Sequence, residues 1–136
     1  LGCQPSAQVD LTRADASTLR LHSKAAHYDD RPNGRTALVI DMSAAAEAPA
    51  YVYLTYPSGN GVFLSADALR GFVVTLEDGQ WQRHDIETAS LETHPQWHDR
   101  RGQLDVACAD GTAISGKYVA RMSSRFVREF ENRFTR

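Results

Sequence analysis

The sequence predicts a mainly β domain, an antiparallel sandwich or barrel of six to eight strands that ends in a C-terminal amphipathic α-helix. Short segments such as residues 103–109 alternate apolar and polar side chains, and this period of two is typical of half-buried strands. Turn residues separate these segments, for example Asn33 and Gly34, which both tolerate positive φ. Only the C-terminal segment repeats its apolar residues at the helical spacings of three and four.

The first half of the chain contains the clearest strand pattern. We expect strands at residues 18–24 and 36–42, and the second of these is a continuous apolar run that predicts a central position in the sheet. Residues 43–50 are expected to form a loop or a single helical turn, which Pro49 ends. Residues 51–56 follow as a strand with Tyr51 and Tyr53 on one face.

Turn residues divide the second half into further short segments. Ser65 and Gly71 bracket a predicted helix of one or two turns. We interpret residues 88–102 as a long loop, because they are mixed in character and contain Pro95. The remaining predicted strands are residues 62–64 as the partner of 51–56, residues 72–76 with 81–87 at an edge, and residues 103–109 with 112–121.

The C-terminal helix begins after a cap at Ser123 or Ser124. Its apolar face carries a valine and three phenylalanines, namely Phe126, Val127, Phe130 and Phe134. We expect this face to cover the open face of the sheet, because an antiparallel sheet of this size needs an apolar cover. Docking on a membrane surface or in a partner groove is the alternative.

The composition fits one globular domain. With 136 residues, 42% hydrophobic and 24% charged, the chain can bury a core without disulfide cross-links. Fifteen Lys plus Arg against seventeen Asp plus Glu give a net charge of -2, which argues against nucleic-acid binding because no basic field attracts phosphates. No apolar run approaches the roughly 20 residues of a membrane-spanning helix.

The first three residues, Leu1-Gly2-Cys3, resemble the end of a bacterial lipobox, in which the cysteine is acylated. The resemblance implies that Cys3 carries a lipid and that the protein is a periplasmic lipoprotein. It would be attached to a bacterial membrane, most readily the outer membrane, only through this lipid. We therefore expect residues 1–12 to form a tether and residues 13–136 to form the single β-rich domain. An ordinary cysteine in an N-terminal segment is the alternative.

A second resemblance concerns the last predicted hairpin. Ser115-Gly116-Lys117-Tyr118 is similar to the Ser-Gly-x-x-Tyr motif of the periplasmic inhibitors of C-type lysozyme, although it is one residue shorter. The segment that starts at Cys108 and ends at Gly111 also resembles that family, but the strands that should separate the two elements are absent. The resemblance implies a small β-barrel lipoprotein in which Ser115 and Tyr118 are the functional residues.

The residues do not favour an enzyme. His94 and His98 have the spacing of a helical zinc-binding pair, but Pro95 between them disrupts the helix, so we predict no metal site and no cofactor. Cys108 is expected to be buried and unreactive, because it shares a strand face with apolar residues. Neither a nucleophile elbow nor a phosphate-binding loop is present, and we predict that the protein is not an enzyme.

Two groups of residues are candidates for binding a protein partner. Tyr51 and Tyr53 would present amphipathic rings if their strand face is exposed to solvent. The second group lies in the predicted loop and combines an aromatic side chain with cationic and imidazole groups, namely His94, Trp97, His98 and Arg100. Insertion of Trp97 into the core is the alternative.

These observations together predict an envelope-facing lipoprotein that binds another macromolecule. The most concrete version is an inhibitor or immunity protein for a periplasmic enzyme, which would bind tightly through a rigid loop. The alternatives are an accessory subunit of an envelope or secretion assembly and a small-ligand-binding β-barrel. The last alternative predicts an apolar cavity of several hundred Å³. The oligomeric state does not follow from the sequence.

Overall fold

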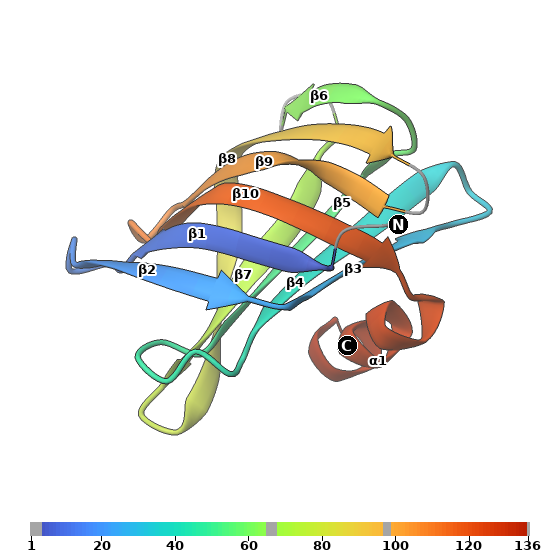
Figure 1. The fold of residues 1–136 in the computed structure, drawn as a ribbon. Helices are drawn as coiled ribbons and strands as arrows, with labels where there is room; N and C mark the ends of the chain where they lie inside the picture. The colour runs from blue at the N-terminus through green and yellow to red at the C-terminus, as the bar shows by residue number, and fades with distance from the viewer. Residues whose placement is uncertain (1–3, 65–67, 97–98, 136) are drawn as a thin grey trace.

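A computed structural model describes residues 4–64, 68–96 and 99–135. Within these ranges the chain forms ten strands and one helix, and the sheet curves round into a closed β-barrel (Figure 1). This architecture confirms the predicted mainly β fold with a C-terminal helix. The elements are β1 Ser6–Thr12, β2 Thr18–Ser23, β3 Ala25–Asp30, β4 Arg35–Met42, β5 Ala50–Pro57, β6 Gly61–Leu64, β7 Arg70–Glu77, β8 Gln80–Gln96, β9 Asp99–Cys108, β10 Ala113–Met122 and α1 Ser124–Phe134.

Seven strands close the barrel, in the order β3-β4-β5-β7-β8-β9-β10 and back to β3. The closing pair, β10 with β3, is parallel and joins Arg121 to His27 and Met122 to Tyr28. The other pairings of the described strands are antiparallel, which lets short hairpins connect most of them. The β1–β2 hairpin continues the wall, because β1 pairs with the first part of β10.

The first strand corrects the predicted tether. Residues 6–12, which we expected to link a lipid to the domain, form β1 and are part of the barrel wall. Ala7, Val9 and Leu11 point inward and are at most 4% exposed. Ala7, Val9 and Leu11 alternate with polar residues, and this alternation indicates a strand. The pattern is weak because the segment also contains small side chains such as Ala7.

The predicted loop at residues 88–102 is also wrong, because β8 runs through to Gln96 and pairs with β9. Its charged residues are exposed or partly exposed, while Leu91 and Thr93 are completely buried on the inner face. Pro95 is tolerated near the end of the strand, opposite Arg100. Strand β8 is therefore not an edge strand, since it pairs with β7 and then with β9 and β6.

Two smaller predictions also change. Strand β6, expected to pair with residues 51–56, pairs instead with β8, and β5 lies between β4 and β7. Gly71, expected to end a short helix, belongs to β7. Ser65, the expected start of that helix, lies outside the described residues.

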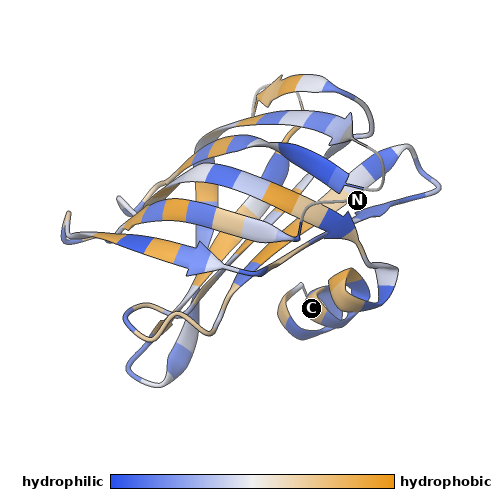
Figure 2. Ribbon diagram, in the orientation of Figure 1, coloured by the Kyte–Doolittle hydropathy of each residue, from blue (hydrophilic) through white to orange (hydrophobic). Residues whose placement is uncertain are grey.

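Apolar side chains fill the inside of the barrel. Figure 2 shows the alternation along the strands as orange and blue bands. Inward-facing residues from opposite parts of the wall are at most 1% exposed, namely Leu38, Ile40, Leu54, Leu91, Val106 and Ile114. A small barrel whose interior is filled in this way is a packed core.

Two glycines allow the strands to approach closely where the wall curves. A Cβ added to Gly102 would lie 1.7 Å from the carbonyl oxygen of Glu92, and one added to Gly116 would lie 2.1 Å from that of Gln8. Any other residue at these positions would push the backbones apart. The curvature of β9 and β10 therefore depends on the absence of these side chains.

Helix α1 covers the outer face of β4, β5 and β7, as the phenylalanine pattern predicted. Val127 and Phe130 are buried against a second apolar cluster outside the barrel. The ring of Phe130 lies 5.2 Å from that of Tyr51 and 5.4 Å from that of Tyr53. Ser123 is the N-cap, and its hydroxyl accepts a hydrogen bond from the backbone N–H of Phe126.

A polar network fastens the same helix to the barrel. Arg31 forms ion pairs with Asp29, at 3.0 Å, and with Glu131 of the helix. The Tyr53 hydroxyl also donates to Glu131, and the Ser124 hydroxyl donates to Asp29 at 2.6 Å. Burial, together with the carboxylate of Glu131, raises the pKa of Tyr53 well above its usual range. The phenol therefore remains a donor at ordinary pH.

We predict that Phe130→Ala lowers the free energy of unfolding by about 3 to 5 kcal/mol, because it empties the centre of the helix interface. Urea unfolding followed by circular dichroism measures the change. Arg128→Ala, on the exposed face of the same helix, should change stability by less than about 0.5 kcal/mol. Equal stability of the two variants would show that the helix does not contribute to the barrel fold.

Candidate functional site

The site begins at a bend in the barrel wall. Strand β2 ends at Ser23 and β3 begins at Ala25, so Lys24 lies between them. Before the bend the chain pairs with β1, and after it the chain pairs with β4. Among the described strands, no backbone ladder joins β2 to β4. The wall therefore opens slightly where the two pairings separate.

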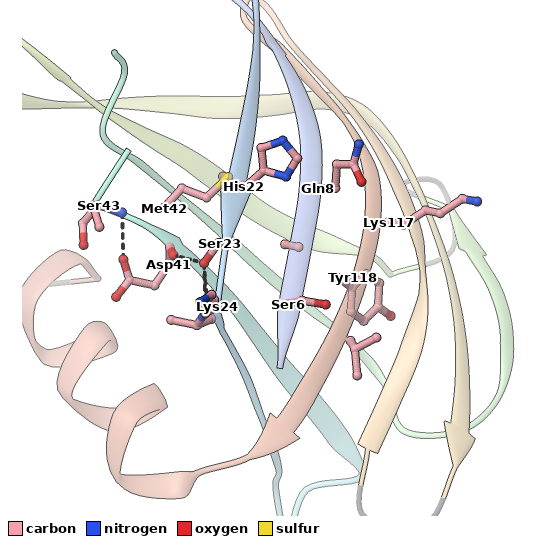
Figure 3. A pocket seen from close by; sticks show the side chains of 14 residues that line it. Ser6, Gln8, His22, Ser23, Lys24, Asp41, Met42, Ser43, Lys117 and Tyr118 are labelled. Atoms are coloured by element: carbon pink, nitrogen blue, oxygen red, sulfur yellow. Dashed lines mark hydrogen bonds between the residues drawn. The ribbon is translucent and has the colours of Figure 1, made fainter. Parts of the chain in front are cut away.

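Hydrogen bonds of Ser23 fix this bend. Its hydroxyl oxygen accepts from the backbone N–H of Ala25 at 2.9 Å and donates to the carbonyl oxygen of Asp41 on β4. The Asp41 carboxylate in turn accepts from the backbone N–H of Ser43 at 2.8 Å. Figure 3 shows these bonds at the edge of the cavity described next. Side chains thus replace the missing ladder between β2 and β4.

A cavity of about 730 Å³, open to solvent, lies over the bend (Figure 3). We call it the wall pocket. Its volume is within the range of small-molecule sites. The side chains that define it come from four strands and from the bend between β2 and β3, namely Ser6 and Gln8 of β1, His22 of β2, Lys24 of the bend, Asp41 and Met42 of β4, and Lys117 and Tyr118 of β10.

The exposed lining of the wall pocket is mostly apolar. Ala25, Ala44 and Val119 contribute partly or fully exposed surface, and the nearly buried Met42 and Tyr118 lie at its base. The Tyr118 hydroxyl donates to the carbonyl oxygen of Glu92 at 3.3 Å, so its polar end is used in the core. Burial also raises the pKa of Tyr118 well above its usual range.

Both lysines of the chain border this pocket. The sequence contains only Lys24 and Lys117, and both line the wall pocket from opposite sides. In Figure 3, Lys117 extends outward from β10. Neither ammonium has a carboxylate within 4.0 Å among the residues that the structure describes. Asp41 is the one described carboxylate in the lining. The mouth of the pocket is therefore locally cationic.

Comparisons of the chain with protein-family models, curated proteins and solved structures found no match. Function therefore has to be argued from this geometry.

The tyrosines that we expected to contact a partner do not face solvent. Tyr51 is 7% exposed and Tyr53 is 8% exposed, because α1 covers both. Their predicted role in partner binding required a strand face exposed to solvent, and this face is buried under α1. This contact could have been predicted from the sequence. The apolar face of the C-terminal helix and the aromatic face of residues 51–56 both need to be buried, and each can cover the other.

Two of the other predicted partner-binding residues, His94 and Arg100, lie near the end of the β8–β9 hairpin. His94 is largely exposed, with its Nε2 2.9 Å from Glu92 Oε1. Arg100 forms an ion pair with Asp30 at 3.0 Å and lies over the ring of Tyr28. Trp97 and His98 lie outside the described residues, as does Cys3. The structure therefore places two of these side chains at one end of the barrel.

The residues of the lysozyme-inhibitor resemblance do not lie together. Ser115 is exposed on the outer face of β10, whereas Tyr118 is 2% exposed and faces the core. Cys108 is buried, as expected, and its environment raises the pKa of its thiol to about 12. Burial is the main cause, and such a thiol is a poor nucleophile at neutral pH.

No cluster of three or more His, Cys, Asp or Glu side chains in the described ranges has a geometry that could hold a metal ion. Nor does any helix within them have the length and continuous apolar character needed to cross a membrane.

Sequence reasoning missed a polar cluster at the opposite end of β8. His84 is nearly buried, and its Nδ1 lies 2.6 Å from Asp110 Oδ2 while its Nε2 lies 2.7 Å from the hydroxyl of Thr75. The Thr75 hydroxyl donates to Glu77 at 3.0 Å, so its proton is directed at that carboxylate. The cluster joins the β7–β8 hairpin to the turn between β9 and β10. No sequence spacing signals it.

Contacts within this cluster lower the pKa of Asp110. The backbone N–H of Thr112 donates to its carboxylate at 3.0 Å and, together with His84, lowers the pKa of Asp110 from 3.8 to about 2. Because the pKa is lower in the folded state, the ionised carboxylate stabilises the fold above pH 4. This contribution is lost as the pH falls from about 4 to about 2.

We predict that Asp110→Asn reduces the stability of the protein at pH 6 and that the difference from the wild type shrinks between pH 4 and pH 2. The variant lacks the ionised carboxylate whose protonation causes the loss. Urea midpoints measured across this pH range test the prediction. A difference that stays constant down to pH 2 would contradict it.

Proposed function

We propose that this protein is a binding β-barrel that holds a small, mostly apolar molecule in the wall pocket. The observation that carries the proposal is the open cavity of about 730 Å³ over Met42 and Tyr118. Side chains fill the barrel interior, so a ligand has room in the wall and not at the centre. The small-ligand-binding barrel among the sequence-based alternatives is thus the one that the geometry favours.

A binding role suits the polar groups of the lining better than catalysis. The Ser23 hydroxyl is engaged by two backbone groups, and the Asp41 carboxylate is engaged by Ser43. A nucleophile needs a base within hydrogen-bond reach. His22 has no hydroxyl or thiol partner among the described residues that line the wall pocket. Retention of a ligand requires only shape and apolar surface, which this pocket has.

We further propose that the barrel is attached to the bacterial envelope through acylated Cys3, on the periplasmic side. The support is the resemblance of Leu1-Gly2-Cys3 to a lipobox. Strand β1 starts only three residues later, at Ser6, so an acylated Cys3 would hold the wall within about 10 Å of the bilayer. Ser6 also lines the wall pocket. The pocket would then lie near the membrane surface.

A neutral dye that fluoresces in apolar surroundings, Nile red, tests binding without any contribution from charge. We predict that Ala44→Trp weakens dye binding at least tenfold, because the indole occupies the pocket. Ala46→Trp is the matched control, since Ala46 is exposed in the same segment but does not line the pocket. Fluorescence titration gives the affinities. Equal binding by the two variants would contradict the assignment of the wall pocket.

Capture of a macromolecule through the β8–β9 hairpin is a second candidate function. The observation that favours it is the firm base of this hairpin. Asp99 is 2% exposed with Arg121 Nε at 4.0 Å, and Arg100 is held between Asp30 and the ring of Tyr28. A firm base of this kind suits an inhibitor or immunity protein, because it reduces the entropy lost on binding.

For this second function, we predict that Trp97→Ala weakens capture of an envelope protein by about 2 kcal/mol or more, since aromatic anchors dominate such interfaces. Affinity capture from envelope extract, followed by titration of the captured protein, measures the change. Gln80→Ala, exposed at the other end of β8, serves as the control. Undiminished capture by Trp97→Ala would remove the hairpin as the contact.

A further inference from the structure

We infer that the wall pocket selects an amphiphile with one acidic headgroup, a carboxylate or a phosphate, joined to an aliphatic chain. The inference rests on the proposed function, because it names the chemical class of the ligand that the same pocket would hold. It depends on an asymmetry in how this chain uses its cationic residues.

Cations elsewhere in the chain are arginines, and many of them already have partners. Arg20 pairs with Asp10 at 2.9 Å, Arg83 pairs with Asp85 at 2.8 Å, and Arg100 pairs with Asp30 at 3.0 Å. The two lysines have no such partner among the described residues, and both border one cavity. Their charges therefore remain available to an anion that comes from outside.

The charge of the pocket is opposite to that of the whole chain. Two ammonium groups face one carboxylate in the lining, Asp41, whereas the complete sequence has a net charge of -2. Asp41 is also oriented by the backbone N–H of Ser43 at the edge of the cavity. A local excess of positive charge complements an anionic headgroup.

Lysine suits this mouth because its stem is apolar and flexible. The stem can lie along the apolar wall while the ammonium stays in water. Lys117 extends outward from β10 in Figure 3, and we infer that rotation about its flexible stem lets the ammonium approach a ligand in the pocket. A headgroup between Lys24 and Lys117 would then be contacted from both sides.

The apolar part of the lining suits an aliphatic chain. Ala25 and Val119 leave apolar surface exposed, and the thioether of Met42 adapts its shape to what packs against it. Because no ladder joins β2 to β4 in the described sheet, the wall can yield here without breaking backbone hydrogen bonds between these strands. Apolar burial thus supplies affinity, and the lysines supply selectivity.

The size of the selectivity follows from the exposure of the lysines. An exposed ion pair changes an affinity by a factor of about two to five, so two lysines together should contribute a factor of about four to twenty-five. This effect is large enough to measure, although too small to hold a ligand without the apolar contact. Salt should weaken it by screening.

The test compares four ligands that share a twelve-carbon chain: dodecanoate, dodecyl phosphate, dodecanol and dodecyltrimethylammonium, each below its micelle concentration. We predict that the wild type binds one or both of the acidic ligands more tightly than dodecanol by a factor of about four to twenty-five. It should bind the cationic ligand no more tightly than dodecanol. The difference between dodecanoate and dodecyl phosphate identifies the preferred headgroup. Isothermal titration calorimetry at low and high salt gives these affinities.

Substitutions then assign the preference to the lysines. Lys24→Gln/Lys117→Gln should lose the preference for acidic ligands but retain the affinity for dodecanol. Arg20→Gln removes one positive charge from β2 outside the lining and should keep the preference within about twofold. Equal binding of all headgroups by the wild type would overturn this inference and leave the proposed function intact. Absence of binding by all four ligands and by Nile red would overturn both.

Discussion

The barrel depends on which strands form hydrogen bonds with the two edges of β10. One edge pairs with β9 over its whole length, whereas the other pairs first with β1 and then with β3. Backbone N–H and C=O groups in a barrel wall need hydrogen-bond partners. After β1 the chain therefore pairs with β1 as β2, and then pairs with β4 as β3. The bend at Lys24 is the result of that change. The wall pocket is therefore a consequence of closing the barrel and not a separate addition to it.

The two faces of the wall have different covers for a related reason. Strands β4 and β5 carry apolar side chains on both faces, as shown by Leu38 and Val39, which point to opposite clusters. The inner face packs in the barrel, and the outer face needs α1. The ion pairs of Arg31 then fix the position of the helix. No helix in the described part of the chain covers the side with the wall pocket in this way.

Local patterns allowed most of the fold to be predicted. A continuous apolar run predicted β4, alternation predicted β5, and a turn after the preceding strand predicted β10. The phenylalanine spacing predicted both α1 and the surface that it covers. Strand β1 was missed because Ala7 and Gln8 resemble a tether in composition. The end of β8 was missed because its inward residues include Thr93, which is polar although completely buried.

The site could not be predicted, because its parts meet only through the closure of the barrel. Lys24 and Lys117 lie far apart in the sequence, and neither is part of a motif. The one available signal was that the chain has two lysines and many arginines. This composition does not predict where in the fold the two lysines lie. His84 and Asp110 meet in the same way, through the pairing of separate hairpins. Chemistry that depends on long-range pairing leaves no local pattern.

The pairing of β1 with β10 also determines when the barrel can form. The two strands are separated by roughly a hundred residues, and contacts of such long range slow folding because a large loop must close first. A nascent chain cannot complete the wall until its last strand has left the ribosome. Until then β1 and β3 have unpaired edges, which invite association with other chains.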